Sequence, residues 1–438
     1  MISVAQQEEQ LKELFNERAT TLAQQTGFVQ RRRQISGADF VQGLVFGWLH
    51  QPGASLGDLA GAMAYREVSI SDSGLTQRFT PQAATFLQAM LAEVVGHVME
   101  VEPVPIPVLQ RFQAVIIEDS SQIALPDELQ EQWRGCGGNQ QHTEASIKLH
   151  VRWDLKQGSL QGPLLSDGRL ADQRSPLRSQ GIPAGALYIT DEGYFGLMWL
   201  KQQSQAGGFF LTRPRYKTAF FDQQGQRLAL QEIGPKVVHQ SLDLPVLVGT
   251  QVRLKARLVM VRVPEEVAEQ RREQIRETAR KHGRQANEQQ LALAQWTILI
   301  TNVPAALLSV AEVLVLARAR WQIERLFRLW KEGGQIDEWR SKKPWRILCE
   351  IYGKLIAQVV QHWCLLLTWP QPDRSLVKAA KVVRSHALQF IEVLMGESSL
   401  EHLLRKLQRG MARCRLNRRA KHPNLSQLLL EGLDWPLT

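Results

Sequence analysis

The stretch RARWQIERLFRLWK, residues 318–331, decides how the rest of the chain is interpreted. It predicts a helix on which, at about 100° per residue, one narrow stripe carries a single acid among three bases: Arg320, Glu324, Arg328 and Lys331. A neighbouring stripe is apolar and would anchor the helix to a core: Leu316, Ile323, Phe327 and Trp330. Taken alone, the pattern is also typical of a surface ladder of salt bridges, because Glu–Arg pairs at i, i+4 are ordinary helix chemistry. The choice depends on what else in the chain could use this carboxylate.

Composition favours a soluble protein with a polyanionic partner. The chain has 438 residues, enough for two or three domains with full cores, and its 44% hydrophobic and 22% charged residues are typical of globular proteins. Its formal charge of +10 at pH 7 favours nucleic acid, because Lys and Arg that displace condensed counterions are the main source of affinity for it. Charge alone does not separate DNA from RNA or from a membrane surface.

Neither export nor insertion into a membrane is expected. The first residues, MISVAQQEEQLKELF, carry acids and glutamines where a signal peptide needs a basic run followed by an apolar one. The most apolar run, Ala305–Ala317, is interrupted by Glu312 and is too short to span a bilayer. The cysteines are far apart and lack CxxC spacing, so neither a zinc site nor a disulfide framework is indicated. These features predict a reducing, cytoplasmic setting.

The N-terminal part is expected to form a helical domain that contacts DNA. Helical patterns alternate with short breaks, and the basic cluster Arg31, Arg32 and Arg33 lies at one of them. The short helical patterns of residues 56–79 could include a helix-turn-helix. The alternative is a plain helical cap.

After a proline-rich linker the period changes to that of strands. Four strands are predicted: residues 113–121, 146–155, 159–165 and 186–195. The first three suggest an antiparallel meander, and the fourth delivers Asp191 at its C-terminal end. The alternation of strands and helices then stops, and a mainly β insertion follows. This insertion separates the helix containing Glu324 from the preceding strands by about a hundred residues.

The C-terminal region is predicted to be helical and basic. Residues 405–423, RKLQRGMARCRLNRRAKHP, contain no acid among their Lys and Arg, so they form either a phosphate-binding surface or a solvated face. The overall charge favours contact with nucleic acid. The expected division is a helical DNA-binding domain at 1–100, an α/β catalytic core at 109–215 and 304–365, a mainly β insertion at 216–303, and a helical basic region at 366–438 for dimerisation or DNA contact.

Three acids stand out by their positions in these elements: Asp119, Asp191 and Glu324. Carboxylates at the ends of two neighbouring strands and on a packed helix can converge on a pair of Mg²⁺ ions, which prefer oxygen ligands and can drive an in-line phosphoryl transfer. Each aspartate alone could instead cap a turn or helix. Glu118 and Glu192 are adjacent acids, but consecutive strand residues point to opposite faces, so only one of each pair is expected to reach the site.

The combination of IIEDSS (116–121), ITDEGYF (189–195), WTILITNVP (296–304) and the opening stretch resembles the bacterial DDE transposases of the insertion-sequence-four family. The family signature around its third acid is Tyr, two residues, Arg, three residues, Glu, six residues, Lys. Arg320, Glu324 and Lys331 match at that spacing, whereas Ala317 stands at the tyrosine position. A phenol there would hydrogen-bond a phosphate, and alanine cannot.

The resemblance implies a ribonuclease-H-like core, with a mixed five-stranded sheet and helices, interrupted by a β insertion. Asp119, Asp191 and Glu324 would be the catalytic metal ligands for two Mg²⁺ ions, with Mn²⁺ able to substitute. Residues implied or expected to contact DNA are Arg320, Lys331, Trp296, Arg328, Arg31, Arg32 and Arg33. Trp296 has the place of a tryptophan that stacks a flipped base in relatives, although a core strand residue is the alternative interpretation.

The implied function is cut-and-paste transposition in the bacterial cytosol, associated with the nucleoid. Water would free a 3′-OH at a transposon end, and that hydroxyl would attack the opposite strand to form a hairpin, and later the target. The expected partners are double-stranded DNA, as terminal inverted repeats and target, and a second copy of the chain in a synaptic homodimer. Two alternatives are a catalytically impaired relative that regulates by binding DNA, and a stand-alone nuclease of the same fold.

Overall fold

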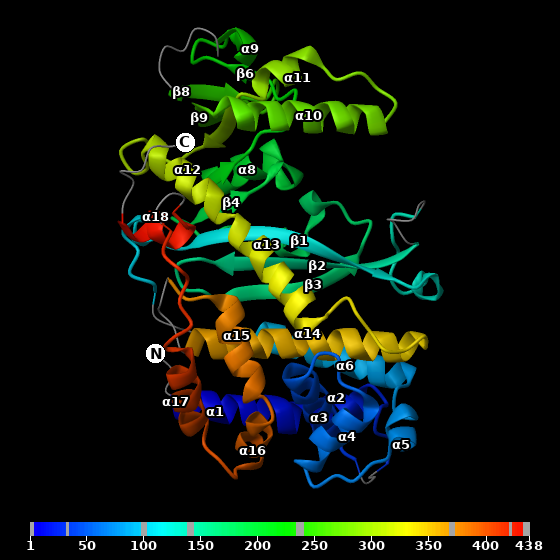
Figure 1. Ribbon diagram of the computed structural model, residues 1–438. Helices are drawn as coiled ribbons and strands as arrows, with labels where there is room; N and C mark the ends of the chain where they lie inside the picture. Colours follow the sequence, from blue (N-terminus) through cyan, green and yellow to red (C-terminus); the bar gives the residue numbers. More distant parts are fainter. Residues whose placement is uncertain are drawn as a thin grey trace.

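A computed structural model of the protein describes residues 4–31, 35–97, 103–137, 144–233, 241–367, 373–419 and 423–431. Figure 1 shows three parts stacked along the long axis: a helical base, a central sheet crossed in front by two consecutive helices, and an upper part with further strands and helices.

The helical pattern expected near the N-terminus is confirmed for the described residues. The helices are α1 (Val4–Lys12), the π-helical η1 (Glu13–Arg18), α2 (Ala19–Gln25), α3 (Gly37–His50), α4 (Leu56–Ala64), α5 (Asp72–Thr76) and α6 (Pro81–Gly96). Ser36 and Ser55 start α3 and α4 with capping boxes, which satisfy backbone N–H groups that the first helical turn leaves free. The region suggested for a helix-turn-helix contains α4 and the five-residue α5.

The strands form one mixed sheet. Its members are β1 (Val115–Leu125), β2 (Ala145–Asp154), β3 (Leu160–Asp167), β4 (Leu187–Thr190), β5 (Phe209–Thr212), β6 (Phe220–Phe221), β7 (Arg227–Leu228), β8 (Ser241–Val248), β9 (Leu254–Arg262) and β10 (Trp296–Thr301). The order is β3-β2-β1-β4-β5-β10-β9-β8-β6-β7. The antiparallel meander β1–β2–β3 is confirmed, and β1, β4 and β5 run parallel.

The sheet is larger than the five strands expected. It has ten strands in the described part of the chain, because β10 pairs with β5 and thereby joins β6–β9 to the edge of the first five. Strands β6 and β7 form a hairpin around residues 223–225, within the region predicted to be a mainly β insertion. Strand β1 is also longer than predicted, so Asp119 lies in its middle rather than at its end.

The remaining helices cover the sheet and build the base. They are α7 (Pro107–Gln110), α8 (Leu197–Gln205), α9 (Leu230–Ile233), α10 (Glu265–Lys281), α11 (Glu288–Leu293), α12 (Val310–Ala319), α13 (Trp321–Arg328), the π-helical η7 (Leu329–Gly333), α14 (Pro344–Leu367), α15 (Leu376–Ser385), α16 (Gln389–Met395), α17 (Leu400–Met411) and α18 (Leu425–Glu431). Short 3₁₀ turns occur at Asp127–Leu129 (η2), Asp172–Arg174 (η3), Pro176–Gln180 (η4) and Glu192–Tyr194 (η5). In Figure 1, α12 and α13 cross in front of the sheet, and α14 lies with α6 beneath it.

The main hydrophobic core joins the base to one face of the sheet. It takes alternate residues of β2, Ile147, Leu149 and Val151, together with α14 and the apolar stripe of α12–α13. The predicted anchoring stripe is confirmed, because its four members are at most 6% exposed: Leu316, Ile323, Phe327 and Trp330. A second core, around Leu258 and Trp296, lies among the upper strands. Within the described ranges, no helix is both long enough and apolar enough to cross a membrane.

Candidate active site

Two strands bring the aspartates to one region. Strand β1 carries Asp119, and its parallel neighbour β4 ends at Thr190, so Asp191 begins the following turn. The Oδ1 atom of Asp191 accepts hydrogen bonds from the backbone N–H of Gly193 at 2.9 Å and of Tyr194 at 3.3 Å. Asp191 is therefore also a turn cap, as its alternative interpretation proposed, and this cap fixes the direction of its carboxylate.

The helix α13 brings the third acid against β1. Arg320, between α12 and α13, places Nη1 at 3.1 Å from Oδ2 of Asp119, while its Nη2 donates to Oε1 of Glu324. The salt-bridge interpretation of the opening stretch is thus correct for Arg320 and Glu324, but the same guanidinium also reaches an acid 201 residues away in the chain. One cation therefore joins two carboxylates from a strand and a helix.

The carboxylate of Asp119 lies in an unfavourable place for a charge. Burial is the main cause that raises its pKa to about 7. The backbone N–H of Ser120 and the guanidinium of Arg320 act in the opposite direction. The negative charges of Asp191 and Glu324 raise the pKa of Asp119 further, so both acids act electrostatically on Asp119.

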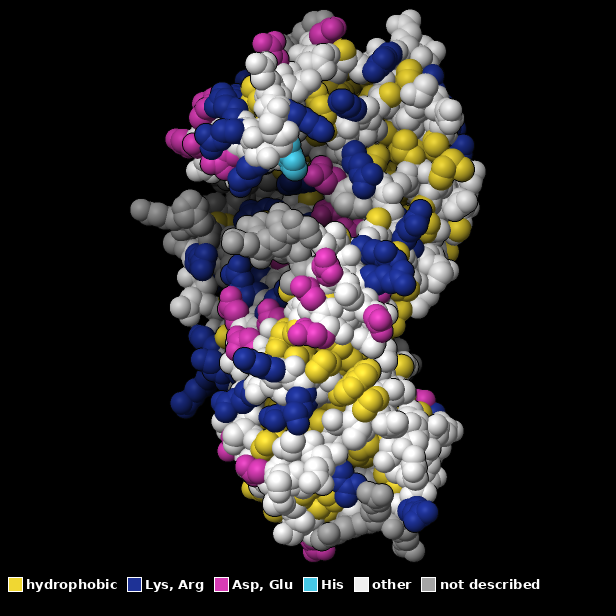
Figure 2. Space-filling view, turned by 90° about the vertical axis from the view of Figure 1, so that its right-hand side faces the viewer, with side chains coloured by type: hydrophobic (Ala, Val, Ile, Leu, Met, Phe, Trp, Pro, Cys, Tyr) yellow, Lys and Arg dark blue, Asp and Glu magenta, His cyan; other side chains and the backbone are white. Residues whose placement is uncertain are grey.

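Two grooves border these acids. A shallow one of about 420 Å³ is lined by Asp119, Ser120, Ser121, Glu324, Phe327, Arg328, Lys331 and Glu332. A larger one of about 910 Å³ extends from Asp191 and Arg320 past Ala317 to the upper strands, where Arg213, Arg262 and Arg271 line it. In Figure 2, Lys and Arg side chains gather beside the hollow between the upper part and the middle of the molecule.

The two other bases of the stripe on residues 318–331, Lys331 and Arg328, differ in their contacts. Lys331 lies in the π-helical turn η7, and its Nζ donates to the backbone oxygen of Gln122 on β1 at 2.8 Å. Arg328 is exposed, and its Nε lies 3.7 Å from Oε1 of Glu332, a pairing that contributes little in water. Both line the smaller groove beside Glu324, so both are positioned to meet a ligand there.

Trp296 does not face these grooves. Its side chain is 4% exposed and packs in the second hydrophobic core, with the guanidinium of Arg262 5.0 Å from its ring centroid. The core interpretation therefore describes its position, and stacking on a base would require the ring to leave that core. Asn302, in the same family-like run, joins β10 to β5 by accepting from the N–H of Phe210 at 2.7 Å.

The basic cluster near the N-terminus lies far from the acids in the chain. Arg31 is exposed, whereas Arg32 and Arg33 fall outside the described residues. On the C-terminal helix α17, Leu403 and Leu407 pack inward while Arg405 and Arg409 are exposed, so this helix presents a basic outer face.

The sequence interpretation missed Arg213 and Trp321. Arg213 directly follows β5, just as Asp191 follows the parallel strand β4, and parallel strands end at the same edge of a sheet. Desolvation first, and then the nearby cation Arg320, lower the pKa of Arg213. Trp321 opens α13 and is 57% exposed at the edge of the larger groove, which is unusual for an indole in water. The end of β5 was the signal that could have revealed Arg213.

The donor chemistry of this site suits a divalent metal ion, but the present arrangement is not yet a metal centre. Carboxylate oxygens are the ligands that Mg²⁺ prefers, and a cation would relieve the repulsion that Asp119 experiences. Among the described residues, however, no group of three or more His, Cys, Asp or Glu is assembled closely enough to hold a metal ion. The reason is visible in the contacts, because Arg320 occupies the space between Asp119 and Glu324 and the carboxylate of Asp191 caps its own turn.

Comparison with known families now identifies the class of protein. Residues 110–360, more than half of the chain, match the family described as Transposase DDE domain, and this range contains all three acids. The chain belongs to this family. DDE transposases are enzymes that cleave and join DNA, and the family uses divalent metal ions.

Relatives extend the similarity beyond that domain. The chain is 26% identical over 424 residues to the transposase for insertion sequence element IS231E of Bacillus thuringiensis subsp. finitimus, covering 88% of this chain and 87% of the relative. It is 23% identical over 419 residues to the transposase for insertion sequence element IS1151 of Clostridium perfringens, covering 88% and 87%. A putative transposase InsL for insertion sequence element IS186A of Escherichia coli (strain K12) is 25% identical over 361 residues, covering 78% and 88%. The relationship thus includes most of the helical regions as well as the acids.

Proposed function

We propose that this transposase cuts and joins the ends of an insertion sequence, with Asp119, Asp191 and Glu324 holding two Mg²⁺ ions, for which Mn²⁺ can substitute. The observation that carries the proposal is the bridge of Arg320 between Asp119 and Glu324, because it gathers an acid from β1 and an acid from α13 around one positive charge. The negative charge of Asp191 is among the causes that raise the pKa of Asp119, which supports including Asp191 as the third acid. The five strands β3-β2-β1-β4-β5 would form the ribonuclease-H-like core.

The bound metal would supply Lewis-acid activation of the attacking oxygen and stabilisation of the leaving oxygen. The residues of the chain do the rest. Arg320 exchanges its two carboxylates for a backbone phosphate of the entering DNA, since a guanidinium forms strong, often bidentate hydrogen bonds with phosphate as it does with carboxylate. This exchange frees Asp119 and Glu324 at the moment when the substrate arrives. DNA binding and metal binding are therefore coupled through one side chain.

Phosphates on either side of the scissile bond would meet the cations of the two grooves. Lys331 and Arg328 line the smaller groove, and Arg213 lines the larger one at the edge that also carries Asp191. Ala317 lines the larger groove without a polar group, and Arg213, which lines the same groove, takes over the phosphate contact of the family tyrosine in this proposal.

Several finer steps rest on the resemblance rather than on these contacts. A hairpin at the cut end is one of them, since Trp296 lies in the core. The pairing of two copies in a synaptic complex, with the exposed bases of α17 and the cluster around Arg31 on the DNA, is another. The protein would act in the bacterial cytosol on the terminal inverted repeats and target DNA.

The test uses the full chain with DNA duplexes made from the inverted repeats beside its gene. With Mg²⁺ or Mn²⁺ the protein should nick the repeat and leave a free 3′-OH. Asp119→Asn, Asp191→Asn and Glu324→Gln should each lower the cleavage rate by about a thousandfold or more, because each removes a charge worth several kcal/mol in the transition state. Affinity for the duplex, measured by gel shift, should stay within about threefold. Undiminished cleavage by the Glu324→Gln variant would contradict the metal assignment.

A further inference from the structure

The face of the sheet opposite Asp119 holds a buried polar cluster that the catalytic proposal does not use. Its members are Glu118, Arg152 and Tyr188, from β1, β2 and β4, and they are 0%, 3% and 0% exposed. Arg152 donates from Nε to Oε2 of Glu118 at 2.5 Å, and the hydroxyl of Tyr188 donates to the same oxygen at 2.9 Å. One carboxylate oxygen therefore joins three adjacent strands.

The cluster lies directly behind the two aspartates. Glu118 precedes Asp119 on β1, and Tyr188 lies three residues before Asp191 on β4. Glu118 is paired across the ladder with Arg152, whereas Tyr188 is paired with Ile116, so its long side chain reaches across to Glu118. A shift of β4 along β1 would move Asp191 relative to Asp119 and would break the bond of Tyr188 at the same time.

The same cluster also holds the loop that leads to Asp191. Nη1 of Arg152 donates to the backbone oxygen of Gly181 at 2.9 Å. Arg178, in η4, donates to the oxygen of Tyr194 at 2.9 Å and stacks 4.0 Å from the ring centroid of Trp199. Because the N–H of Tyr194 caps Asp191, the direction of that carboxylate depends on a chain of contacts that begins in this buried layer.

Stability alone is a poor reason for such a cluster. In the described part of the chain, Oε1 of Glu118 and Nη2 of Arg152 are buried without a hydrogen-bond partner. Replacing a buried ion pair by apolar side chains is often neutral or stabilising for the fold. An incompletely bonded pair between three strands therefore contributes less to the free energy of folding than apolar packing would. Its directional bonds, by contrast, define register and separation, which apolar packing defines less sharply.

We propose that Glu118, Arg152 and Tyr188 are positioning residues that hold Asp119 and Asp191 at the separation needed to bind a divalent metal ion. This inference rests on the proposed function of the two aspartates. It concerns the side of the sheet away from the DNA, so the three residues affect metal binding without touching the substrate.

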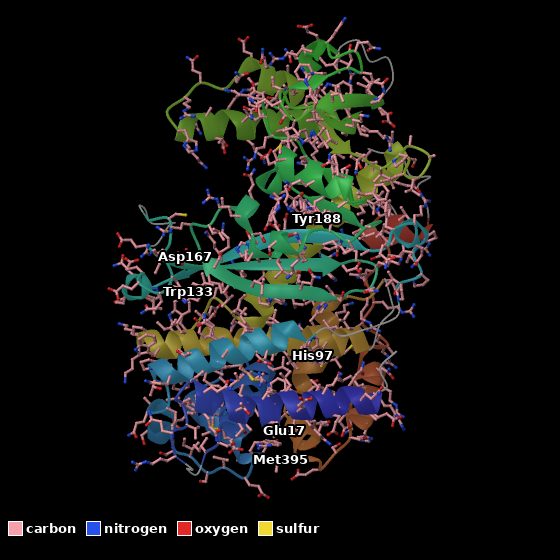
Figure 3. The ribbon with its side chains drawn as sticks, turned by 180° about the vertical axis from the view of Figure 1, so that it is seen from behind. Glu17, His97, Trp133, Asp167, Tyr188 and Met395 are labelled. Carbon is pink, nitrogen blue, oxygen red and sulfur yellow. The ribbon has the colours of Figure 1, made fainter. Side chains whose placement is uncertain are left out.

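The smallest informative change is Tyr188→Phe, which removes one oxygen atom. The control is Tyr352→Phe on α14, because the Tyr352 hydroxyl is also buried and takes part in one hydrogen bond, which it accepts from Nε1–H of Trp133 at 3.1 Å. Figure 3 shows Tyr188 and Trp133 at well-separated places in the molecule, so the control loses one buried hydroxyl and its hydrogen bond away from the cluster. Both variants should fold and should bind the duplex with unchanged affinity.

The direct measurement is Mn²⁺ binding to the full chain in complex with its DNA duplex, followed by the electron paramagnetic resonance of free Mn²⁺. Tyr188→Phe should weaken Mn²⁺ binding by about tenfold, the size usual for partners that orient metal ligands, whereas Tyr352→Phe should not. Raising the Mn²⁺ concentration should restore the cleavage rate of Tyr188→Phe, whereas Tyr352→Phe should need no such increase. Glu118→Gln, which keeps the shape of the side chain, should show the same defect.

Equal Mn²⁺ affinities for the two tyrosine variants would overturn the positioning role. Asp119→Asn in the same assay separates a failure of the positioning role from a failure of the proposed function. If Asp119→Asn loses Mn²⁺ binding while Tyr188→Phe does not, only the positioning role fails. If Asp119→Asn retains both Mn²⁺ binding and cleavage, the proposed function itself fails.

Discussion

The two faces of strands β1, β2 and β4 carry adjacent acids with opposite surroundings. Asp119 faces the helix α13 and borders a groove, and its partner Arg320 sits on a helix where it can exchange one anion for another. Glu118 faces the loop of residues 168–185, is fully buried, and has a partner held in the neighbouring strand. Two consecutive residues of β1 thus differ in access: Asp119 borders a groove that a ligand can enter, whereas Glu118 is fully buried in contacts within the protein.

The kind of segment that covers each face explains the difference. A helix satisfies its own backbone hydrogen bonds, so the face it covers can be apolar. A loop leaves its carbonyl groups without partners, and the other face supplies donors to them: Gln122 to Gly168, Lys148 to Leu170, Arg152 to Gly181. The polar residues Lys148 and Arg152 of β2 are therefore buried as hydrogen-bond donors to the carbonyl groups of residues 168–185.

The largest effect should come from breaking the pair on the loop side. Arg152→Met leaves the Glu118 carboxylate buried without its cation and should lower the free energy of unfolding by about 3–5 kcal/mol, as measured by urea denaturation. The double variant Glu118→Leu/Arg152→Met should recover most of that loss. Arg272→Met on α10, which breaks ion pairs with the exposed Glu265 and Glu269, should cost less than about 1 kcal/mol. A similar cost for Arg152→Met and Arg272→Met would remove the contrast between the faces.

A smaller but more specific effect is expected on the helix side. Arg320→Ala should lower the free energy of unfolding by less than Arg152→Met does, because the Asp119 and Glu324 carboxylates that lose their cation border a groove. It should strengthen Mn²⁺ binding in the absence of DNA by about tenfold, or about 1.4 kcal/mol, because it removes the competing cation. Calorimetric titration of the DNA-free protein with Mn²⁺ measures this change. Arg328→Ala, on the same helix but without a contact to Asp119, is the matched control and should bind Mn²⁺ like the original protein. Unaltered Mn²⁺ affinity in Arg320→Ala would show that Arg320 does not compete with the metal.

The smallest effect concerns pH and tests the buried polar face again. His150 on β2 points into that face, where its Nε2 lies 2.7 Å from Oγ of Ser166, and burial lowers its pKa to about 4. The unfolded chain takes up a proton near pH 6.5 and the folded chain does not, so the stabilisation is complete above pH 6.5 and is lost as the pH falls toward 4. Between pH 6.5 and 5.5, the His150→Gln variant should lose about 1 kcal/mol less stability than the unchanged protein. If the unchanged protein and the His150→Gln variant lost the same amount of stability between pH 6.5 and 5.5, the imidazole of His150 would have to take up its proton in the folded state as it does in the unfolded chain.

Local patterns gave a large part of the fold and the acids of the site. The strands of the meander, the buried stripe of α12–α13 and the position of Asp191 after β4 all follow from periods and strand ends that neighbouring residues define. The extent of the sheet did not, because the pairing of β10 with β5 joins residues about ninety positions apart. The place of Arg213 directly after β5 is a local signal, but the groove that it lines is formed by other strands and by α12 and α13 as well.

The sequence by itself determined the spacing of Arg320, Glu324 and Lys331, the alternation of apolar and polar residues in β2, and the presence of acids at β1 and β4, because each depends on the local period of a helix or strand. Only the tertiary structure decided that the polar side of β2 is covered, that Trp296 is in a core, and that Arg320 joins Asp119 to Glu324. These outcomes depend on which distant segment covers each surface. Residues 168–185 and α13 cover the two faces of β1, and they alone distinguish Glu118 from Asp119.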